Sequence, residues 1–289
     1  MKIIDAHLHF SNIESFKRTA EEISFLDYSY SGLNTEFKEC DIVVGIAMGL
    51  TESSLGGFPD YSSKNPMLLD LEEKIPDSLF CCVGINPLLL EGESKYAELQ
   101  KIEDVLMDEK TVGIKIYAGY YPYHVHDKIY HPIYELAIKY GLPVVIHSGD
   151  TYSDRGLLKY SHPLNVDELA VMYRKIDFVI AHFGDPWIMD TAEIIRKNYN
   201  VYADLSGLIV GDSVNVKRFS DEKPFMDHVQ RGLVYADRYD KVLFGSDWPL
   251  VQIKPFIEFI KKLIPEKHHE NVFYNNALRV FKRLNNQIE

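Results

Sequence analysis

The chain begins with MKIIDAHLHF, in which His7 and His9 stand one residue apart at the end of an apolar run. In a β-strand alternate side chains lie on one face, so the two imidazoles are expected to point the same way. Two parallel imidazoles at this spacing are able to bind one metal ion. The same pattern also arises by coincidence on surface strands, so the pair alone does not establish a metal site.

Three more residues that bind metals or transfer protons follow apolar runs further along the chain. His147 ends VVIH, His182 lies in VIAHFG and Asp247 lies in LFGSDWP. Imidazole nitrogen and carboxylate oxygen suit Zn²⁺ and similar divalent ions. An open position on such an ion holds water and lowers its pKa towards neutrality, which makes hydroxide available as a nucleophile. One such histidine alone is ordinarily a hydrogen-bonded core residue, so the prediction depends on all five residues meeting in space.

Short β-rich runs alternate with segments of helical periodicity along the chain. Eight runs are predicted to be strands: 2–7, 41–48, 79–85, 111–117, 142–148, 178–184, 201–207 and 241–247. Helical patterning is clear at 95–110, 129–141, 165–175 and 189–198. Alternating strands and helices are typical of a parallel sheet with helices outside it. Eight such units favour a single-domain TIM (β/α)₈ barrel over residues 1–289 rather than an open doubly wound sheet.

A barrel places the C-terminal ends of its strands at one rim, where active sites are built, so we expect the five residues to meet there. Two long loops, 49–66 and 149–163, lie on the same rim and are candidate binding elements. Alternation predicts two faces on the first strand: Asp5, His7 and His9 on one, and Ile4, Ala6 and Leu8 outward against helices. On the fifth strand it predicts Val145 and His147 inward, and Val144 and Ile146 outward.

Five motifs make the chain resemble the amidohydrolase superfamily. They are DAHLHF, VIHSG, AHFG, GSDWP and the C-terminal NVFYNNALRVF, and together they span Asp5 to Phe281. Within the superfamily the chain is most similar to the group that includes aminocarboxymuconate-semialdehyde decarboxylase and related lactone hydrolases. The resemblance implies a distorted TIM barrel with a metal ion, commonly zinc, on its C-terminal rim.

The resemblance also implies roles for single residues. Its metal ligands would be His7, His9, His147 and Asp247. His182 would contact the metal-bound water as an acid/base or polarise the substrate. Asp247 would also accept the proton of that water.

Lys115, in TVGIKIY, is expected to point into the barrel from the face that it shares with Gly113 and Tyr117. In binuclear members of the superfamily a lysine after the fourth strand is carboxylated and bridges two metal ions, although the group resembled here usually holds one. A positive charge that meets a substrate carboxylate is a second role. A structural lysine paired with Asp5 or Asp204 is a third, since a buried ammonium needs a partner. All three roles stay open, and we expect one divalent ion, Zn²⁺, rather than two.

Weaker candidates for substrate contacts surround the expected site. Tyr117 belongs to an aromatic cluster after the fourth strand, Trp248 continues GSDWP, and Arg155 lies on the loop after the fifth strand. Loop packing and surface solvation are the ordinary explanations for such residues. Asp5 is expected to orient a ligand histidine, because ligating imidazoles usually donate their second N–H. The HVH at 124–126 is set in a loop, and we interpret it as a solvated or structural pair.

Composition narrows the class of protein further. The 289 residues are 46% hydrophobic and carry a formal net charge of −12. Surfaces for nucleic acid or anionic membranes need clustered lysine and arginine, so we expect neither partner. No apolar run is long enough for a membrane span, and the N-terminus lacks a signal-peptide pattern. With three cysteines, of which the adjacent Cys81 and Cys82 point to opposite faces, a reducing cytoplasm is the expected location.

These inferences lead to one prediction and two alternatives. We predict a metal-dependent hydrolase in which activated water attacks a C–N or an ester/lactone bond of a small molecule, carboxylated or not. Non-oxidative decarboxylation on the same site is the first alternative, distinguished by release of CO₂ without net addition of water. The second is a metal-free barrel that binds a small ligand, for which chelation and His7→Ala leave binding unchanged. The sequence leaves open whether the chain forms a homo-oligomer.

Overall fold

The strands lie side by side in the order in which they occur in the chain. The computed structural model describes residues 1–52, 55, 57, 60–71 and 74–287. Its strands form one eight-stranded sheet in which every neighbouring pair is parallel. They are β1 (Ile3–Leu8), β2 (Ile42–Met48), β3 (Leu79–Ile85), β4 (Thr111–Ile116), β5 (Val144–Ile146), β6 (Phe178–Ile180), β7 (Val201–Asp204) and β8 (Val242–Leu243).

Hydrogen bonds between the chain around β8 and strand β1 complete the ring. Ala6 N donates to Phe244 O at 2.9 Å, and Asp247 N donates to His7 O at 2.8 Å. The predicted TIM barrel is therefore confirmed.

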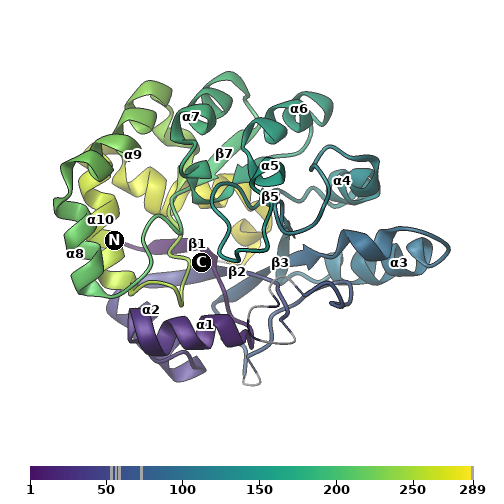
Figure 1. The fold of residues 1–289 in the computed structure, drawn as a ribbon, viewed down its shortest axis with the longest axis horizontal. Helices are drawn as coiled ribbons and strands as arrows, with labels where there is room; N and C mark the ends of the chain where they lie inside the picture. Colours follow the sequence, from purple (N-terminus) through teal and green to yellow (C-terminus); the bar gives the residue numbers. More distant parts are fainter. Residues whose placement is uncertain (53–54, 56, 58–59, 72–73, 288–289) are drawn as a thin grey trace.

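Helices surround the strands (Figure 1). The α-helices are α1 (Glu14–Thr19), α2 (Tyr30–Glu39), α3 (Lys95–Leu106), α4 (His131–Tyr140), α5 (Leu158–Ser161), α6 (Leu164–Met172), α7 (Ile188–Lys197), α8 (Ser213–Asp221), α9 (Lys223–Ala236), α10 (Ile253–Leu263) and α11 (Asn276–Val280). Short 3₁₀ and π segments are η1 (Ala20–Ser24), η2 (Pro87–Leu90), η3 (Lys128–Tyr130), η4 (Ala181–Gly184), η5 (Tyr239–Lys241), η6 (Glu266–His268), η7 (Asn271–Asn275) and η8 (Lys282–Asn286). Within the described part of the chain, no helix combines the length and the apolar character that crossing a membrane requires.

The four helices predicted from periodicity are present as α3, α4, α6 and α7, and they end within a few residues of the predicted bounds. The predicted loop 49–66 includes residues outside the described part of the chain, and its described residues contain no helix or strand. The predicted loop 149–163 contains the short helix α5.

The last four strands are shorter than predicted. Each was expected to span seven residues, whereas β5 and β6 contain three, β7 four and β8 two. After β6 the chain turns at once, because His182 and Phe183 have φ angles of 59° and 48°. These are left-handed conformations that a strand does not contain.

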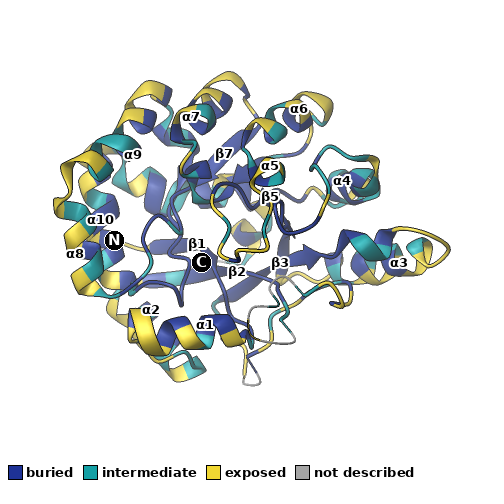
Figure 2. Cartoon of the chain, in the orientation of Figure 1, coloured by how far each residue is buried: buried dark blue, intermediate teal, exposed yellow. Residues whose placement is uncertain are grey.

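Two apolar clusters pack on the two sides of the barrel wall. The outer cluster joins the strands to the helices and includes Val144 and Ile146, while the inner cluster includes Val145, as the alternation on the fifth strand predicts. Figure 2 shows the same division, with buried strands at the centre and helices whose outward sides are exposed. The wall therefore carries a hydrophobic layer on each side.

Strand β1 does not alternate as expected, and two of its predicted orientations are wrong. Ile4 and Ala6 pack in the inner cluster, not outward, whereas Leu8 does pack in the outer cluster. The ladder pairs Asp5 with Gly45 and Leu8 with Ala47, so β1 has one residue more than β2 in this stretch. Such a bulge re-aims the side chains next to it, and here it brings the imidazole of His7 to the inside of the rim.

The C-terminal segment, Asn271–Asn286, fills the end of the barrel where the strands begin. Phe281 and Leu284 pack into the inner cluster. Arg283 Nη1 donates to the carbonyls of Leu106 and Thr111 at 2.8 and 2.6 Å, next to the start of β4. The last of the five sequence motifs is therefore a structural cap, and it leaves the other rim for chemistry.

Candidate active site

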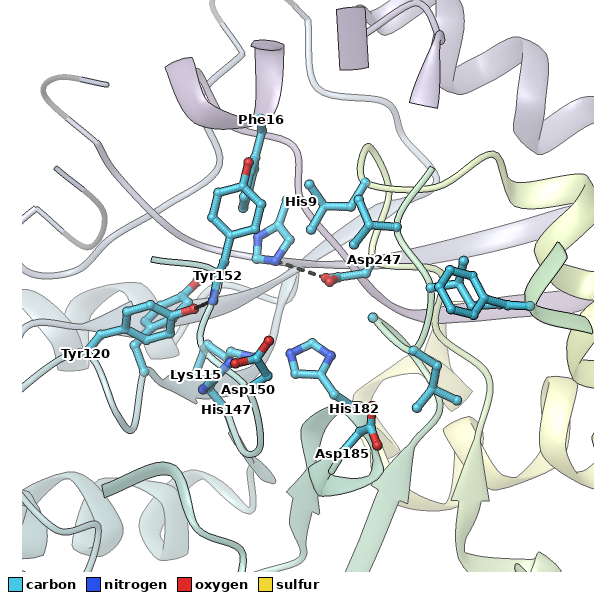
Figure 3. Close-up of a pocket in the computed structure, with 17 residues that line it drawn as sticks. His9, Phe16, Lys115, Tyr120, His147, Asp150, Tyr152, His182, Asp185 and Asp247 are labelled. Carbon is cyan, nitrogen blue, oxygen red and sulfur yellow. Dashed lines mark hydrogen bonds and ion pairs between the residues drawn. The ribbon is translucent and has the colours of Figure 1, made fainter. Parts of the chain in front are cut away.

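A cavity of about 360 Å³ opens at the rim formed by the C-terminal ends of the strands. Its polar lining comes from the ends of β1, β4, β5, β6 and β8 and the segments that follow them, and Figure 3 shows these side chains around one space. The charged and histidine side chains in the lining are His9, Lys115, His147, Asp150, His182, Asp185 and Asp247. The aromatic and aliphatic walls are Phe16, Tyr117, Tyr120, Tyr152, Leu208, Ile209, Val210, Phe219 and Leu250.

His7, His9 and Asp247 form a group that is able to hold a metal ion. Their ligand atoms lie within 4.8 Å of one another, and all three residues are buried. Asp247 Oδ1 is 3.2 Å from His9 Nε2 and 3.6 Å from His7 Nε2 (Figure 3 marks the shorter pair). Strand β1 and the turn after β8 therefore deliver two nitrogens and one oxygen to a single point.

His147 lies near this group without joining it. Its ring centroid is 5.2 Å from that of His182, but its Nε2 does not lie within 4.8 Å of all three ligand atoms of this group. Its Nδ1 lies 2.9 Å from the carbonyl oxygen of Ala118. Because a carbonyl only accepts, Nδ1 carries the proton and Nε2 is left unprotonated.

The donor set fits a divalent metal. Asp247 Oδ1 and His9 Nδ1 are buried atoms that have no hydrogen-bond partner in the described part of the chain. A buried carboxylate oxygen without a donor is costly unless something cationic meets it. His7 supports the same interpretation, because its Nδ1 donates to Asp204 Oδ2 at 2.9 Å and its Nε2 is thereby unprotonated and turned to Asp247.

A second group of ligand atoms within 4.8 Å comprises His7, His182 and Asp204. Asp204 is fully buried at the end of β7, and its Oδ2 accepts from His7 as described above. Its Oδ1 accepts from His182 N at 3.0 Å, from Ser206 N at 3.1 Å and from Ser206 Oγ at 2.5 Å. Both oxygens of the Asp204 carboxylate therefore already accept hydrogen bonds from protein groups.

The local backbone explains how His182 reaches the cavity. It occupies the left-handed turn of η4, directly after β6. Gly207, itself at φ 67°, lies behind its ring, and a Cβ atom there would come within 2.5 Å of His182 Nδ1. Only glycine both adopts this backbone readily and leaves room for the imidazole.

Burial governs the protonation of the site. It lowers the pKa of His7 and His9, lowers that of His147 well below the ordinary value, and lowers that of His182 to about 4. All four imidazoles are therefore neutral at neutral pH, which is the form that binds metals. Burial also lowers the pKa of the Lys115 ammonium to about 8, against the attraction of Asp204 and Asp247.

The two carboxylates next to the histidines remain ionised. Burial by itself raises the pKa of Asp247 and of Asp204, but the imidazoles around each of them outweigh that effect and lower it. Asp5 behaves differently, because its burial raises its pKa to about 7 in spite of hydrogen bonds from Ser246.

Most residues proposed from the sequence meet at the cavity, and two of the weaker candidates do not. His7 lies beneath the cavity lining, while Lys115 and Tyr117 belong to it. Trp248 is fully buried, where its Nε1 donates to Glu36 Oε1 at 3.3 Å, and it does not belong to the described lining of the cavity. Arg155 is exposed and does not belong to the described lining.

The structure also assigns Asp5 and Lys115 more narrowly than the sequence did. Asp5 accepts hydrogen bonds from Ser246 N, Ser246 Oγ and the His7 backbone N–H, but not from an imidazole. The carboxylate that accepts from the imidazole of His7 is that of Asp204. Lys115 Nζ lies 3.2 Å from His7 Nε2 and forms no direct ion pair with Asp5 or Asp204, although the charge of Asp204 favours the protonated form of the lysine.

Several side chains in or next to the cavity were not predicted. Ser206 was not singled out, and Asp204 was considered only as a partner of Lys115. Phe16 and Tyr152, which pack against each other with ring centroids 5.5 Å apart, form a wall of the cavity. The HVH pair lies apart from the cavity lining, with the rings of His124 and His126 stacked at 5.2 Å.

Comparison with known families gives a direct match. A family model described as "Amidohydrolase" matches residues 88–283, more than half of the chain. No curated protein sequence matches the chain.

Solved structures share the fold at low sequence identity. An uncharacterised TIM-barrel protein from Bordetella bronchiseptica superposes with a TM-score of 0.69 at 18% identity, over 99% of this chain and 100% of that one. A probable 2-pyrone-4,6-dicarboxylic acid hydrolase from Acinetobacter baumannii gives 0.63 at 16%, over 98% and 100%. A 5-carboxyvanillate decarboxylase from Novosphingobium aromaticivorans, complexed with manganese and 4-hydroxy-3-methoxy-5-nitrobenzoic acid, gives 0.62 at 14%, over 97% and 96%.

Proposed function

This chain belongs to the amidohydrolase family, and we propose that it is a metal-dependent hydrolase of small molecules. The observation that carries the proposal is the group of His7, His9 and Asp247, in which a buried carboxylate oxygen faces two imidazole nitrogens and lacks a hydrogen-bond partner in the described part of the chain. We propose these three residues as ligands of one divalent ion, Zn²⁺, with His147 as the fourth ligand from the opposite wall.

A divalent ion held there supplies Lewis acidity, which makes water acidic enough to react near neutral pH and polarises a substrate carbonyl. The protein's own groups move the protons. Asp247, kept ionised, accepts a proton from the attacking water at its carboxylate. His182, with Nδ1 held by Ser206, presents an unprotonated Nε2 toward the cavity, which takes up that proton from Asp247 and delivers it to the leaving group.

The reaction that balances with these groups is hydrolysis of a C–N or an ester/lactone bond. The hydroxyl of water is added to the acyl carbon, the bond to nitrogen or oxygen breaks, and the proton goes to the leaving atom. The apolar walls hold an organic substrate of modest size and exclude bulk water.

Lys115 is the one lysine or arginine in the described lining of the cavity, and its side chain is only 1% exposed. We propose that its ammonium binds a carboxylate of the substrate, with Tyr117 beside it. A carboxylate held at this point also lies close to the metal ligands, which favours non-oxidative decarboxylation as the second candidate function.

Two further expectations concern the binding partner of the protein and its cellular compartment. The partner is a small molecule, and the three cysteines, all of them free thiols, are consistent with a reducing cytoplasm.

The test begins with metal analysis of the purified protein. We expect about one equivalent of a divalent ion per chain, lost in His9→Ala and kept in His124→Ala, a histidine change outside the cavity. Two equivalents in the wild type, lost in Lys115→Met, would instead identify Lys115 as a carboxylated bridge. A protein whose binding of small carboxylates ignores both chelation and His9→Ala would be a metal-free binding barrel.

A second assay separates the two reactions. The metal-loaded enzyme is offered a panel of lactones, aryl esters, amides and hydroxybenzoates in ¹⁸O-labelled water. Hydrolysis places the label in the acid product, whereas decarboxylation releases CO₂ without net addition of water.

A further inference from the structure

One buried carboxylate lies between two histidines that have different roles in the proposed reaction. Asp204 is 0% exposed, and its two oxygens accept hydrogen bonds from different partners. Oδ2 accepts from His7 Nδ1 at 2.9 Å, and Oδ1 accepts from Ser206 Oγ at 2.5 Å and from the His182 backbone N–H at 3.0 Å. The same carboxylate therefore touches a proposed metal ligand directly and reaches the proposed acid/base through a hydroxyl.

The hydrogen bonds around Ser206 determine where the proton of His182 lies. His182 Nδ1 is 2.9 Å from Ser206 Oγ and 3.2 Å from Ser206 O. The carbonyl only accepts, and the single hydroxyl proton is directed to Asp204, so the hydroxyl also accepts from the imidazole. His182 must therefore carry its proton on Nδ1, which leaves Nε2 unprotonated.

His7 has the same arrangement. Its Nδ1 faces the ionised carboxylate, so it also carries the proton there, and its Nε2 is unprotonated and turned to Asp247. Both imidazoles are thus held as the same tautomer by one acidic group.

We propose that Asp204 and Ser206 are positioning residues that fix His7 and His182 together, each with Nδ1 protonated and Nε2 presented to the cavity. The consequence for catalysis rests on the proposed function, while the tautomers themselves do not. Asp204 acts on His7 directly and on His182 through Ser206, so loss of the carboxylate affects both rings and loss of the hydroxyl affects one.

An alternative role for Asp204 is to bind a second cation, since His7, His182 and Asp204 have ligand atoms within 4.8 Å of one another. The hydrogen bonds argue against it. Both Nδ1 atoms are donors here, and Asp204 Oδ1 already accepts three hydrogen bonds, so neither ring offers a lone pair to an ion on this side.

The tautomers are measured directly by two-bond ¹⁵N–¹H correlation spectra of histidine-labelled, metal-free protein. In the wild type, both His7 and His182 should show a protonated Nδ1. In Ser206→Ala, His182 should become a mixture of tautomers because only the weaker carbonyl contact is left, while His7 keeps its form. In Asp204→Asn, the single amide oxygen is able to serve only one partner, so at least one of the two rings should change.

Zn²⁺ affinity, measured by competition with a chromophoric chelator, gives a second readout. Asp204→Asn should weaken Zn²⁺ binding by about 10- to 100-fold, the usual loss when a hydrogen-bond partner of a ligating histidine is removed. Ser206→Ala should leave the affinity within a few-fold of the wild type. Ser161→Ala, which removes a buried hydroxyl bonded to the Gly149 carbonyl, is the matched control and should change neither readout.

The proposal is overturned if His182 keeps a protonated Nδ1 in both variants, or if Ser206→Ala costs as much Zn²⁺ affinity as Asp204→Asn. These results are independent of any turnover assay. A protein with the expected tautomers and no hydrolase activity would contradict the proposed function and leave this inference standing.

Discussion

At the scale of single residues, Asp247 meets two unusual demands. Its backbone is left-handed, with φ at 64°, and its Oδ1 is buried without a hydrogen-bond partner in the described part of the chain. Both features cost stability in the metal-free protein. A bound cation offsets the second, which is why we place this side chain at the centre of the site.

We predict that Asp247→Asn abolishes metal binding at micromolar ion concentrations and reduces activity by at least about a hundredfold. The change keeps the shape of the side chain and removes its charge, so the folded state should persist. Metal content after gel filtration and turnover of the metal-loaded protein measure the two effects. Asp150→Asn, which also removes a carboxylate from the cavity lining, should keep its metal.

Gly207 offers a test of how His182 is placed. We predict that Gly207→Ala lowers turnover by more than about tenfold while metal content stays near that of the wild type, because the new methyl group would press on His182 Nδ1 at 2.5 Å. Gly92→Ala is the matched control, since Gly92 has φ 72° and a Cβ added there would meet no described atom within 4 Å. It should cost only the backbone strain, about 1 kcal/mol of unfolding free energy, and no activity. Equal loss of activity in both variants would contradict the argument.

The sequence was sufficient for the residues that stand at or directly after the strand ends, and insufficient for the contacts that one turn makes with another. His9, Lys115 and His147 follow from alternation on strands in a barrel, and the structure places them in the cavity lining. The link from Asp204 through Ser206 depends on a turn after β7 that meets the turn after β6, and no local pattern encodes that meeting. The position of Trp248 depends on a turn in the same way, because the turn after β8 buries its ring.

At the scale of elements, the order of the strands was predictable and their lengths were not. Apolar residues continue past the ends of β6, β7 and β8, so composition extends these predicted strands into turns whose backbone has already left the ladder. The bulge in β1 is a second example, since one additional residue changes which side chains face inward without any mark in the apolar pattern.

The C-terminal segment is the element whose contribution to stability is simplest to test. We predict that Phe281→Ala destabilises the protein by about 3–5 kcal/mol, because it leaves a cavity under the barrel. Activity per folded molecule should be unchanged, since the ring packs near Gly113 at the start of β4 and away from the histidines. Urea unfolding and a turnover assay at low temperature check the two statements.

Lys282→Ala is the control for that change. Its Nζ pairs with Asp177 at 3.0 Å, but the lysine side chain is 65% exposed, so its removal should cost under about 1 kcal/mol. A similar cost for both variants would show that the segment does not act as a packed cap.

At the scale of the whole molecule, the buried tyrosines set the response to alkaline pH. Burial raises the pKa of Tyr28, Tyr121, Tyr130 and Tyr134 above the ordinary value. In the unfolded chain these phenols ionise near pH 10, so above that pH the unfolded state has lost protons that the folded state keeps. Stability is therefore fully present below about pH 10 and falls as the pH rises, by about 1.4 kcal/mol per pH unit for each such tyrosine.

Tyr130 isolates one of these contributions. Its hydroxyl is buried without a hydrogen-bond partner in the part of the chain that the structure describes, so Tyr130→Phe should be neutral or slightly stabilising at pH 7. Between about pH 10 and pH 12 its unfolding free energy should fall less steeply than that of the wild type, by about 1.4 kcal/mol per pH unit. Urea titrations at several pH values, with tyrosinate absorbance as the probe, decide the point; an unchanged slope would contradict it.

The sealed lower end of the barrel also governs how molecules travel through the enzyme. With Phe281 and Leu284 filling the floor, the cavity communicates with solvent past the loops of the upper rim. Substrate and product consequently enter and leave through the same opening of the cavity. Product that accumulates in solution competes with substrate for the cavity, so the reaction should show product inhibition and slow before the substrate is consumed.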